Sequence, residues 1–118
     1  MSLDILFIHP NASKKIYQSL SKDHSAFEPP IWAGMLANHC RQKNYKTQIL
    51  DCEVNQFDYE KSAKVINDLK PKIACFVVYG QQPSASSQNM EGATKTSIEL
   101  KKVNNEIKVL FVGGHVAA

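Results

Sequence analysis

The stretch Val109-Leu110-Phe111-Val112-Gly113-Gly114-His115-Val116-Ala117-Ala118 decides how the rest of the chain is interpreted. Four apolar residues followed by two glycines are typical of a buried strand that runs into a binding loop. Because glycine has no Cβ and tolerates positive φ, a ligand can lie directly against such a backbone. The stretch therefore predicts a strand whose carboxyl end forms part of a ligand site.

Apolar runs alternate with amphipathic stretches before this strand. The runs predict strands at residues 3–8, 47–50 and 73–79, and the fourth strand at 107–112. The other stretches predict three helices: one from Glu28-Pro29-Pro30 to Asn44, one from the N-cap Asp58 to Lys70, and one through Met90 that ends at Asn104. This order predicts a three-layer α/β fold, a doubly wound parallel sheet of the flavodoxin-like or Rossmann-like kind with strand order 2-1-3-4.

Polar residues and glycines gather where the predicted strands end. In a doubly wound sheet, ligands bind at the carboxyl ends of the strands, near the point where the strand order reverses. Those ends carry His9-Pro10-Asn11, Asp51-Cys52-Glu53, a predicted loop at residues 80–87, and Gly113-Gly114-His115. We therefore expect one binding site along this edge of the sheet.

The composition is that of one folded domain spanning residues 1–118. Apolar residues make up 43% and charged residues 21%, and the formal charge of +3 is spread along the chain, which disfavours a nucleic-acid-binding patch. There is no signal peptide and no apolar run long enough for a membrane span. Three widely spaced cysteines, Cys40, Cys52 and Cys75, favour a reducing, cytoplasmic setting over a disulfide framework or a zinc site.

The common nucleotide-binding motifs are absent from the sequence. Neither G-x-G-x-x-G nor G-x-x-x-x-G-K-[ST] occurs, so the acids Asp51 and Glu53 are weak indications of a ribose site. Asn11-Ala12-Ser13 is a poor match to a flavin phosphate loop, and Tyr79-Gly80 stands where a phospho-receiver needs a carboxylate. A small nucleotide-binding or flavin-binding domain stays open as an alternative, as does a non-catalytic α/β interaction or regulatory module.

The four histidines form no recognisable metal or nucleophile motif. His24 lies in a polar stretch, and His39 falls near the apolar stripe of the first predicted helix. His9 and His115 both follow predicted strands, so they either face one ligand or are turn residues. No H-x-x-x-H, C-x-x-C or C-x-x-x-C-x-x-C pattern occurs, so we expect no metal ligands from this chain.

A combination of short motifs resembles a known cofactor domain. These are Glu28-Pro29-Pro30, Trp32-Ala33-Gly34-Met35-Leu36-Ala37, Tyr45-Lys46-Thr47-Gln48-Ile49-Leu50-Asp51 and Val112-Gly113-Gly114-His115. Together they resemble the N-terminal cobalamin-binding domain of cobalamin-dependent radical SAM enzymes, and the resemblance covers essentially the whole chain.

The resemblance implies a set of cofactor-binding residues. Gly80, Gln81 and Ser84 would contact the nucleotide tail of cobalamin, and Gly113 and Gly114 would let the tail pass the sheet. Asn11 and His115 would belong to the same site. The Asp-x-His-x-x-Gly motif that ligates cobalt in better-known cobalamin modules is absent, which implies base-off cobalamin with no protein histidine on the metal.

The resemblance also implies a larger parent enzyme. The parent would be a radical SAM methyltransferase or cyclase that uses methylcobalamin or hydroxocobalamin. S-adenosylmethionine and a 4Fe-4S cluster would bind only in a downstream domain of the same polypeptide, and the 118-residue chain alone would not be catalytic. A fifth strand would be missing from this fragment, so the chain, with its open sheet edge, is expected to pair with another copy or to be only marginally stable.

Overall fold

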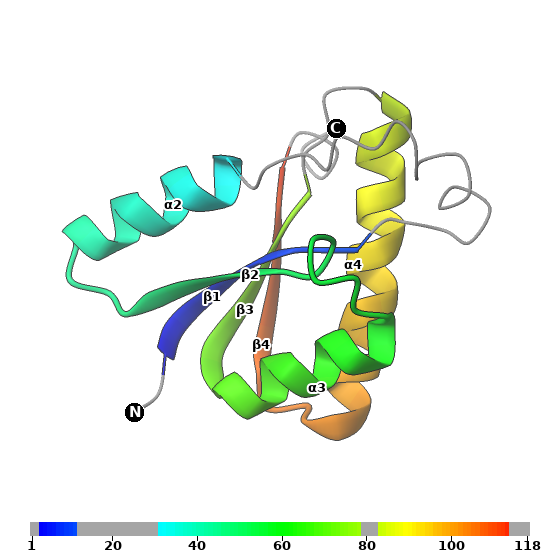
Figure 1. Cartoon of the computed structure of the whole chain (residues 1–118). Helices are drawn as coiled ribbons and strands as arrows, with labels where there is room; N and C mark the ends of the chain where they lie inside the picture. Colours follow the sequence, from blue (N-terminus) through cyan, green and yellow to red (C-terminus); the bar gives the residue numbers. More distant parts are fainter. Residues whose placement is uncertain (1–2, 12–30, 79–82, 114–118) are drawn as a thin grey trace.

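The computed structural model describes residues 3–11, 31–78 and 83–113, without the side chains of residues 31 and 83–88. Its four parallel strands are β1 (Leu3–His9), β2 (Thr47–Asp51), β3 (Pro71–Val77) and β4 (Lys108–Val112), in the order β2-β1-β3-β4. The helices between them are α2 (Ile31–Gln42), α3 (Tyr59–Leu69) and α4 (Pro83–Val103) (Figure 1). The predicted fold, a flavodoxin-like α/β sheet of order 2-1-3-4, is confirmed.

Helices cover both faces of the sheet, α2 on one and α3 with α4 on the other (Figure 1). Because successive side chains of a strand point to opposite faces, β1 sends Leu6 and Ile8 to the α3/α4 side and Phe7 to the α2 side. The larger core lies on the α3/α4 side and includes Ile66 and Phe76. The smaller core lies beneath α2.

The residues that cap the ends of α2 and α3 are the ones that the sequence predicts. The side chain of Asp58 accepts a hydrogen bond of 2.7 Å from the backbone N–H of Lys61, which fixes the start of α3. Asn44, just after α2, has a φ of 70°, and Lys70 closes α3 with a φ of 53°. The predicted opening of the first helix at Glu28-Pro29-Pro30 lies outside the described residues.

Helix α4 begins earlier than the sequence predicts. The prediction placed residues 80–87 in a loop, but the helix already starts at Pro83, so the prediction is wrong for residues 83–87. Proline suits the first position of a helix because its fixed φ is helical and its missing N–H has no intrahelical partner. As a result, Ser84 lies in the first turn of α4 rather than in a loop.

In the described ranges, no helix combines the length and the apolar character that crossing a membrane requires.

Candidate functional site

The carboxyl ends of all four strands meet along one edge of the sheet. His9 at the end of β1 is in register with Asp51 at the end of β2, and Val77 of β3 is in register with Val112 of β4. The first residues of α2 and α4 lie on the same side of the sheet as these strand ends (Figure 1). The sequence prediction that polar residues gather at this edge is therefore confirmed for the ends of β1 and β2.

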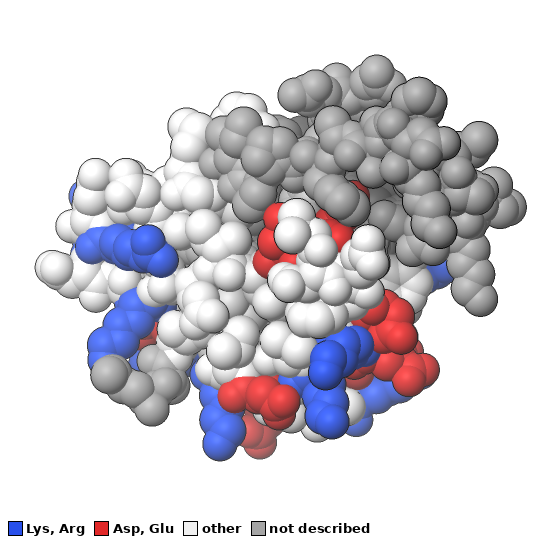
Figure 2. All heavy atoms as spheres, viewed as in Figure 1, with Lys and Arg blue, Asp and Glu red and all other residues white. Residues whose placement is uncertain are grey.

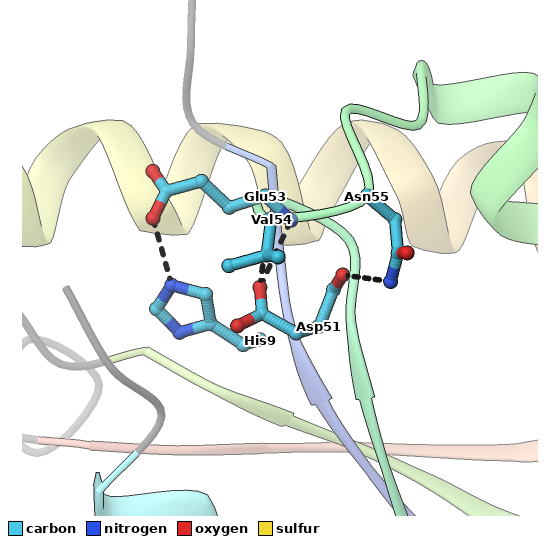
Figure 3. Close-up of polar contacts among 5 residues, drawn as sticks. All are labelled: His9, Asp51, Glu53, Val54 and Asn55. Atoms are coloured by element: carbon cyan, nitrogen blue, oxygen red, sulfur yellow. Dashed lines mark hydrogen bonds and ion pairs between the residues drawn. The ribbon is translucent and has the colours of Figure 1, made fainter. Parts of the chain in front are cut away.

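His9 and Glu53 form a close polar pair at this edge. His9 Nε2 lies 3.1 Å from Glu53 Oε2, and their side chains are only 7% and 16% exposed (Figure 3). The backbone continues the connection, because the N–H of Cys52 donates to the carbonyl of His9 at 2.9 Å. With its proton on Nε2, the imidazole donates to the carboxylate, so that nitrogen is engaged within the protein.

Asp51 shapes the turn that brings Glu53 to His9. Its Oδ1 accepts hydrogen bonds from the N–H groups of Glu53 at 3.1 Å and Val54 at 3.0 Å. Asn55 Nδ2 donates to the backbone carbonyl of Asp51 at 2.7 Å (Figure 3). Asp51 thus works as a turn-forming residue, as aspartate often does by bonding to the backbone two residues ahead.

Asn11 is buried behind the end of β1. Its Nδ2 donates to the backbone carbonyl of Phe57 at 2.8 Å, which joins the loop after β1 to the loop before α3. Helix α4 crosses this loop at Gly92, where an added Cβ would lie only 2.5 Å from the carbonyl oxygen of Asn11. Sequence reasoning missed Gly92, although a lone glycine inside a helical stretch is a signal of close backbone approach.

Gly113 has a structural reason to lack a side chain. Its φ is +144°, and a Cβ there would lie 2.0 Å from the carbonyl oxygen of Val78. The N–H of Val78 donates to the carbonyl of Val112 at 2.7 Å, so β3 and β4 stay paired up to this point. The close approach of β3 to Gly113 therefore explains why the residue at the end of β4 has no side chain.

The described part of the chain does not include all of the predicted site residues. Gly80, Gln81, Gly114 and His115 lie outside the described residues, as does the side chain of Ser84. The structure brings His9, Asn11 and Gly113 to the same edge of the sheet. It adds Glu53 to them as the partner of His9.

The starts of α2 and α4 carry no acidic residue in their first turns. In contrast, α3 begins with the capping Asp58 and has Glu60 in its first turn. The N-terminus of a helix carries partial positive charge and unpaired N–H groups, which an acidic side chain neutralises. As far as the described residues go, the starts of α2 and α4 therefore suit an anionic group such as a phosphate.

Cys52 and Cys75 are poorly suited to metal binding or nucleophilic chemistry. Burial raises the pKa of Cys52 to about 11, with Asp51 adding to the effect and Ser62 opposing it. Burial also raises the pKa of Cys75 to about 11, and Cys40 contributes a smaller part. A thiol must lose its proton to ligate a metal or attack a substrate. Within the described ranges, no cluster of three or more metal-binding side chains occurs.

The surface charge of the face shown in Figure 2 is mixed. Lys and Arg alternate with Asp and Glu along the lower margin of this view. Ion pairs along α4 fit this pattern, because Lys95 lies 2.9 Å from Glu91 and Lys102 lies 2.9 Å from Glu99.

Comparison with known proteins identifies the family. The sequence model of the B12 binding domain matches residues 25–118, which include α2, β2, α3, β3, α4 and β4. No curated protein and no solved structure matches the chain. The match covers most of the chain and agrees with the flavodoxin-like sheet and with a ligand edge at the carboxyl ends of the strands. The chain belongs to the B12 binding domain family, whose ligand is cobalamin.

Proposed function

We propose that this chain is the cobalamin-holding domain of a radical SAM methyltransferase or cyclase. In this proposal the chain binds cobalamin with the dimethylbenzimidazole off the cobalt and with no protein histidine in its place. The histidine-free mode rests on the sequence, which lacks the Asp-x-His-x-x-Gly motif that ligates cobalt in better-known cobalamin modules. At the cofactor edge, Glu53 holds Nε2 of His9. His39 lies in the last turns of α2, far along that helix from the end that faces the edge.

The described residues fit a cofactor with a phosphate-bearing tail. The starts of α2 and α4, whose first turns hold no acidic residue, offer backbone N–H groups to the phosphate. In the proposal Gly80, Gln81 and Ser84 contact the tail, Gly113 and Gly114 line its path, and Asn11 and His115 complete the site.

When bound, cobalamin supplies a cobalt centre that carries a methyl group or exchanges single electrons. The residues of this chain bind and orient the cofactor and perform no chemistry alone. In the proposal, a radical SAM domain of the same polypeptide supplies S-adenosylmethionine and a 4Fe-4S cluster. A C-x-x-x-C-x-x-C motif in a polypeptide that contains this domain would support the assignment, and a parent with a mutase barrel would contradict it.

Absorbance titration with hydroxocobalamin tests the binding site. The chain is expected to shift the cofactor spectrum to the base-off form, and Gly114→Trp is expected to abolish the shift by filling the path of the tail. Val103→Trp is the matched control, because Val103 ends α4 at the opposite edge of the sheet and is half-exposed. Retention of the shift by Gly114→Trp, or its loss in Val103→Trp, would contradict the proposed site.

Electron paramagnetic resonance of bound cob(II)alamin tests the absence of a nitrogen ligand. We expect a spectrum without nitrogen superhyperfine splitting. A splitting that changes when the protein histidines carry ¹⁵N would show a protein ligand, and one that does not change would show the dimethylbenzimidazole on cobalt. Either result would overturn the proposed binding mode while leaving cobalamin binding itself intact.

A further inference from the structure

The carboxylate of Glu53 keeps a hydrogen-bond acceptor available at the ligand edge. Its Oε2 is engaged by His9 Nε2, whereas within the described ranges Oε1 has no hydrogen-bond partner. Oε1 points away from the imidazole (Figure 3). It also keeps some accessible surface, because Ser62 Oγ is the only fully buried side-chain polar atom of the described residues that lacks a partner. A ligand at this edge can therefore donate a hydrogen bond to Oε1.

The turn after β2 fixes this carboxylate before any ligand binds. The N–H of Glu53 donates to Asp51 Oδ1 at 3.1 Å, and the carbonyl of Glu53 accepts from the N–H of Gln56 at 3.1 Å. The contact with His9 holds the far end of the same side chain. An acceptor that is already ordered loses little conformational entropy on binding, so its hydrogen bond contributes more to affinity.

The His9–Glu53 pair lies beside the point where the strand order reverses. Strands β2 and β3 are on opposite sides of β1, so this point is at the carboxyl end of β1, where His9 lies. Doubly wound sheets bind their ligands in the crevice at this position. The contact with His9 therefore brings the Glu53 carboxylate to the rim of the expected ligand position.

The sheet order and the charge of Glu53 indicate which part of cobalamin lies against it. Strands β2 and β4 are the outer strands, and three strand spacings put them roughly 14 Å apart. The proposed path of the nucleotide tail is at the end of β4, and a carboxylate repels the phosphate of that tail. The corrin ring, in contrast, carries neutral propionamide arms on the face from which the tail leaves, and their N–H groups are hydrogen-bond donors.

We propose that Glu53 Oε1 accepts a hydrogen bond from the amide N–H of one propionamide arm of the corrin ring. This inference rests on the proposed cobalamin function and adds Glu53 to the cofactor-binding residues. The contact also gives specificity, because a free acid on that arm would place two negative charges against each other. Glu53 therefore selects a corrinoid whose arm is amidated over one whose arm ends in a carboxylate.

The monocarboxylic acids of cobalamin test this contact. In each of them the amide of one propionamide arm is hydrolysed to a carboxylate and the rest of the cofactor is unchanged. Absorbance titration at neutral pH is expected to show one isomer binding about tenfold to a hundredfold more weakly than cobalamin, the range for losing a hydrogen bond to a charged group. The other isomers are expected to bind about as tightly as cobalamin.

Glu53→Gln tests whether the carboxylate causes this discrimination. Glutamine keeps the length of the side chain and an oxygen that can accept from His9 Nε2, but it removes the negative charge. The variant is expected to bind the rejected isomer about as tightly as cobalamin. Glu106→Gln is the matched control, because Glu106 is exposed between α4 and β4, at the opposite edge of the sheet, and it should keep the wild-type discrimination.

The outcomes separate this inference from the proposed function. If the wild-type chain binds cobalamin and every isomer equally, the Glu53 contact is wrong while cobalamin binding stands. Discrimination that persists in Glu53→Gln would also overturn the contact. Should circular dichroism show that Glu53→Gln is unfolded, the comparison of isomers on the wild-type chain still decides. A wild-type chain that binds no corrinoid would overturn both the proposed function and this inference.

Discussion

His9 Nε2 lies 3.1 Å from Glu53 Oε2 and joins the carboxyl ends of β1 and β2 at the edge where cobalamin is proposed to bind. The two residues are 44 positions apart in the sequence. Their contact depends on the turn that Asp51 organises after β2. The pair therefore fastens the end of β1 to the turn after β2 at this edge.

Breaking this pair is expected to destabilise the fold. Glu53→Ala leaves a buried imidazole nitrogen without its carboxylate, and a lost partner of this kind costs about 1–3 kcal/mol. Urea unfolding at neutral pH measures the change. Glu106→Ala is the control, because Glu106 is exposed between α4 and β4 and its loss should change the free energy of unfolding by less than about 0.5 kcal/mol. Equal stabilities for the two variants would show that the His9–Glu53 contact contributes nothing.

Two glycines should respond in opposite ways to alanine. Gly113→Ala forces a side chain into a φ of +144° and within 2.0 Å of the Val78 carbonyl, which we expect to cost about 2–4 kcal/mol. Gly34→Ala, in α2 with nothing within 4 Å of the new Cβ, should stabilise the chain by about 0.5–1 kcal/mol. Thermal unfolding of both variants gives the comparison. A stable Gly113→Ala would mean that β3 and β4 separate at this point.

Gly92→Ala should disturb the loop after β1, although Gly92 lies far from that loop in the sequence. The added methyl would lie 2.5 Å from the Asn11 carbonyl, so either α4 or the loop must shift. We expect a loss of about 1–3 kcal/mol, in the range of overpacked cores, together with weaker cobalamin binding, because Asn11 is a proposed site residue. Unfolding and cofactor titration of the same variant separate the two effects. Unchanged affinity in a destabilised variant would remove Asn11 from the site.

The buried thiols should make stability fall in alkaline solution. Burial raises the pKa of Cys52 and of Cys75 from 9.0 to about 11. Between these values the unfolded chain releases the two protons and the folded chain keeps them, so the free energy of unfolding decreases as the pH rises. The limiting slope is roughly 1.4 kcal/mol per pH unit for each thiol. Cys52→Ala should show a shallower decrease than wild type in this window, and an identical slope would contradict the assignment.

The sequence was sufficient for the order of the strands and for the local caps. Apolar runs separated by amphipathic stretches predict a parallel sheet, and Asp58 and Asn44 carry recognisable capping signals. It was insufficient where two segments meet, as at His9 and Glu53 or at Gly92 and Asn11, because spacing along the chain does not report contacts across the fold. The early start of α4 was missed because a serine-rich stretch after proline is equally typical of a turn.

Arg41 and Asn55 donate hydrogen bonds to two backbone carbonyls of the outer strand β2, those of Thr47 and Asp51. A sheet with two open edges can add copies indefinitely and grow into a fibril. By capping two backbone groups of β2, Arg41 and Asn55 make this strand a poorer template for another strand, which lowers the risk of such growth on this side of the sheet.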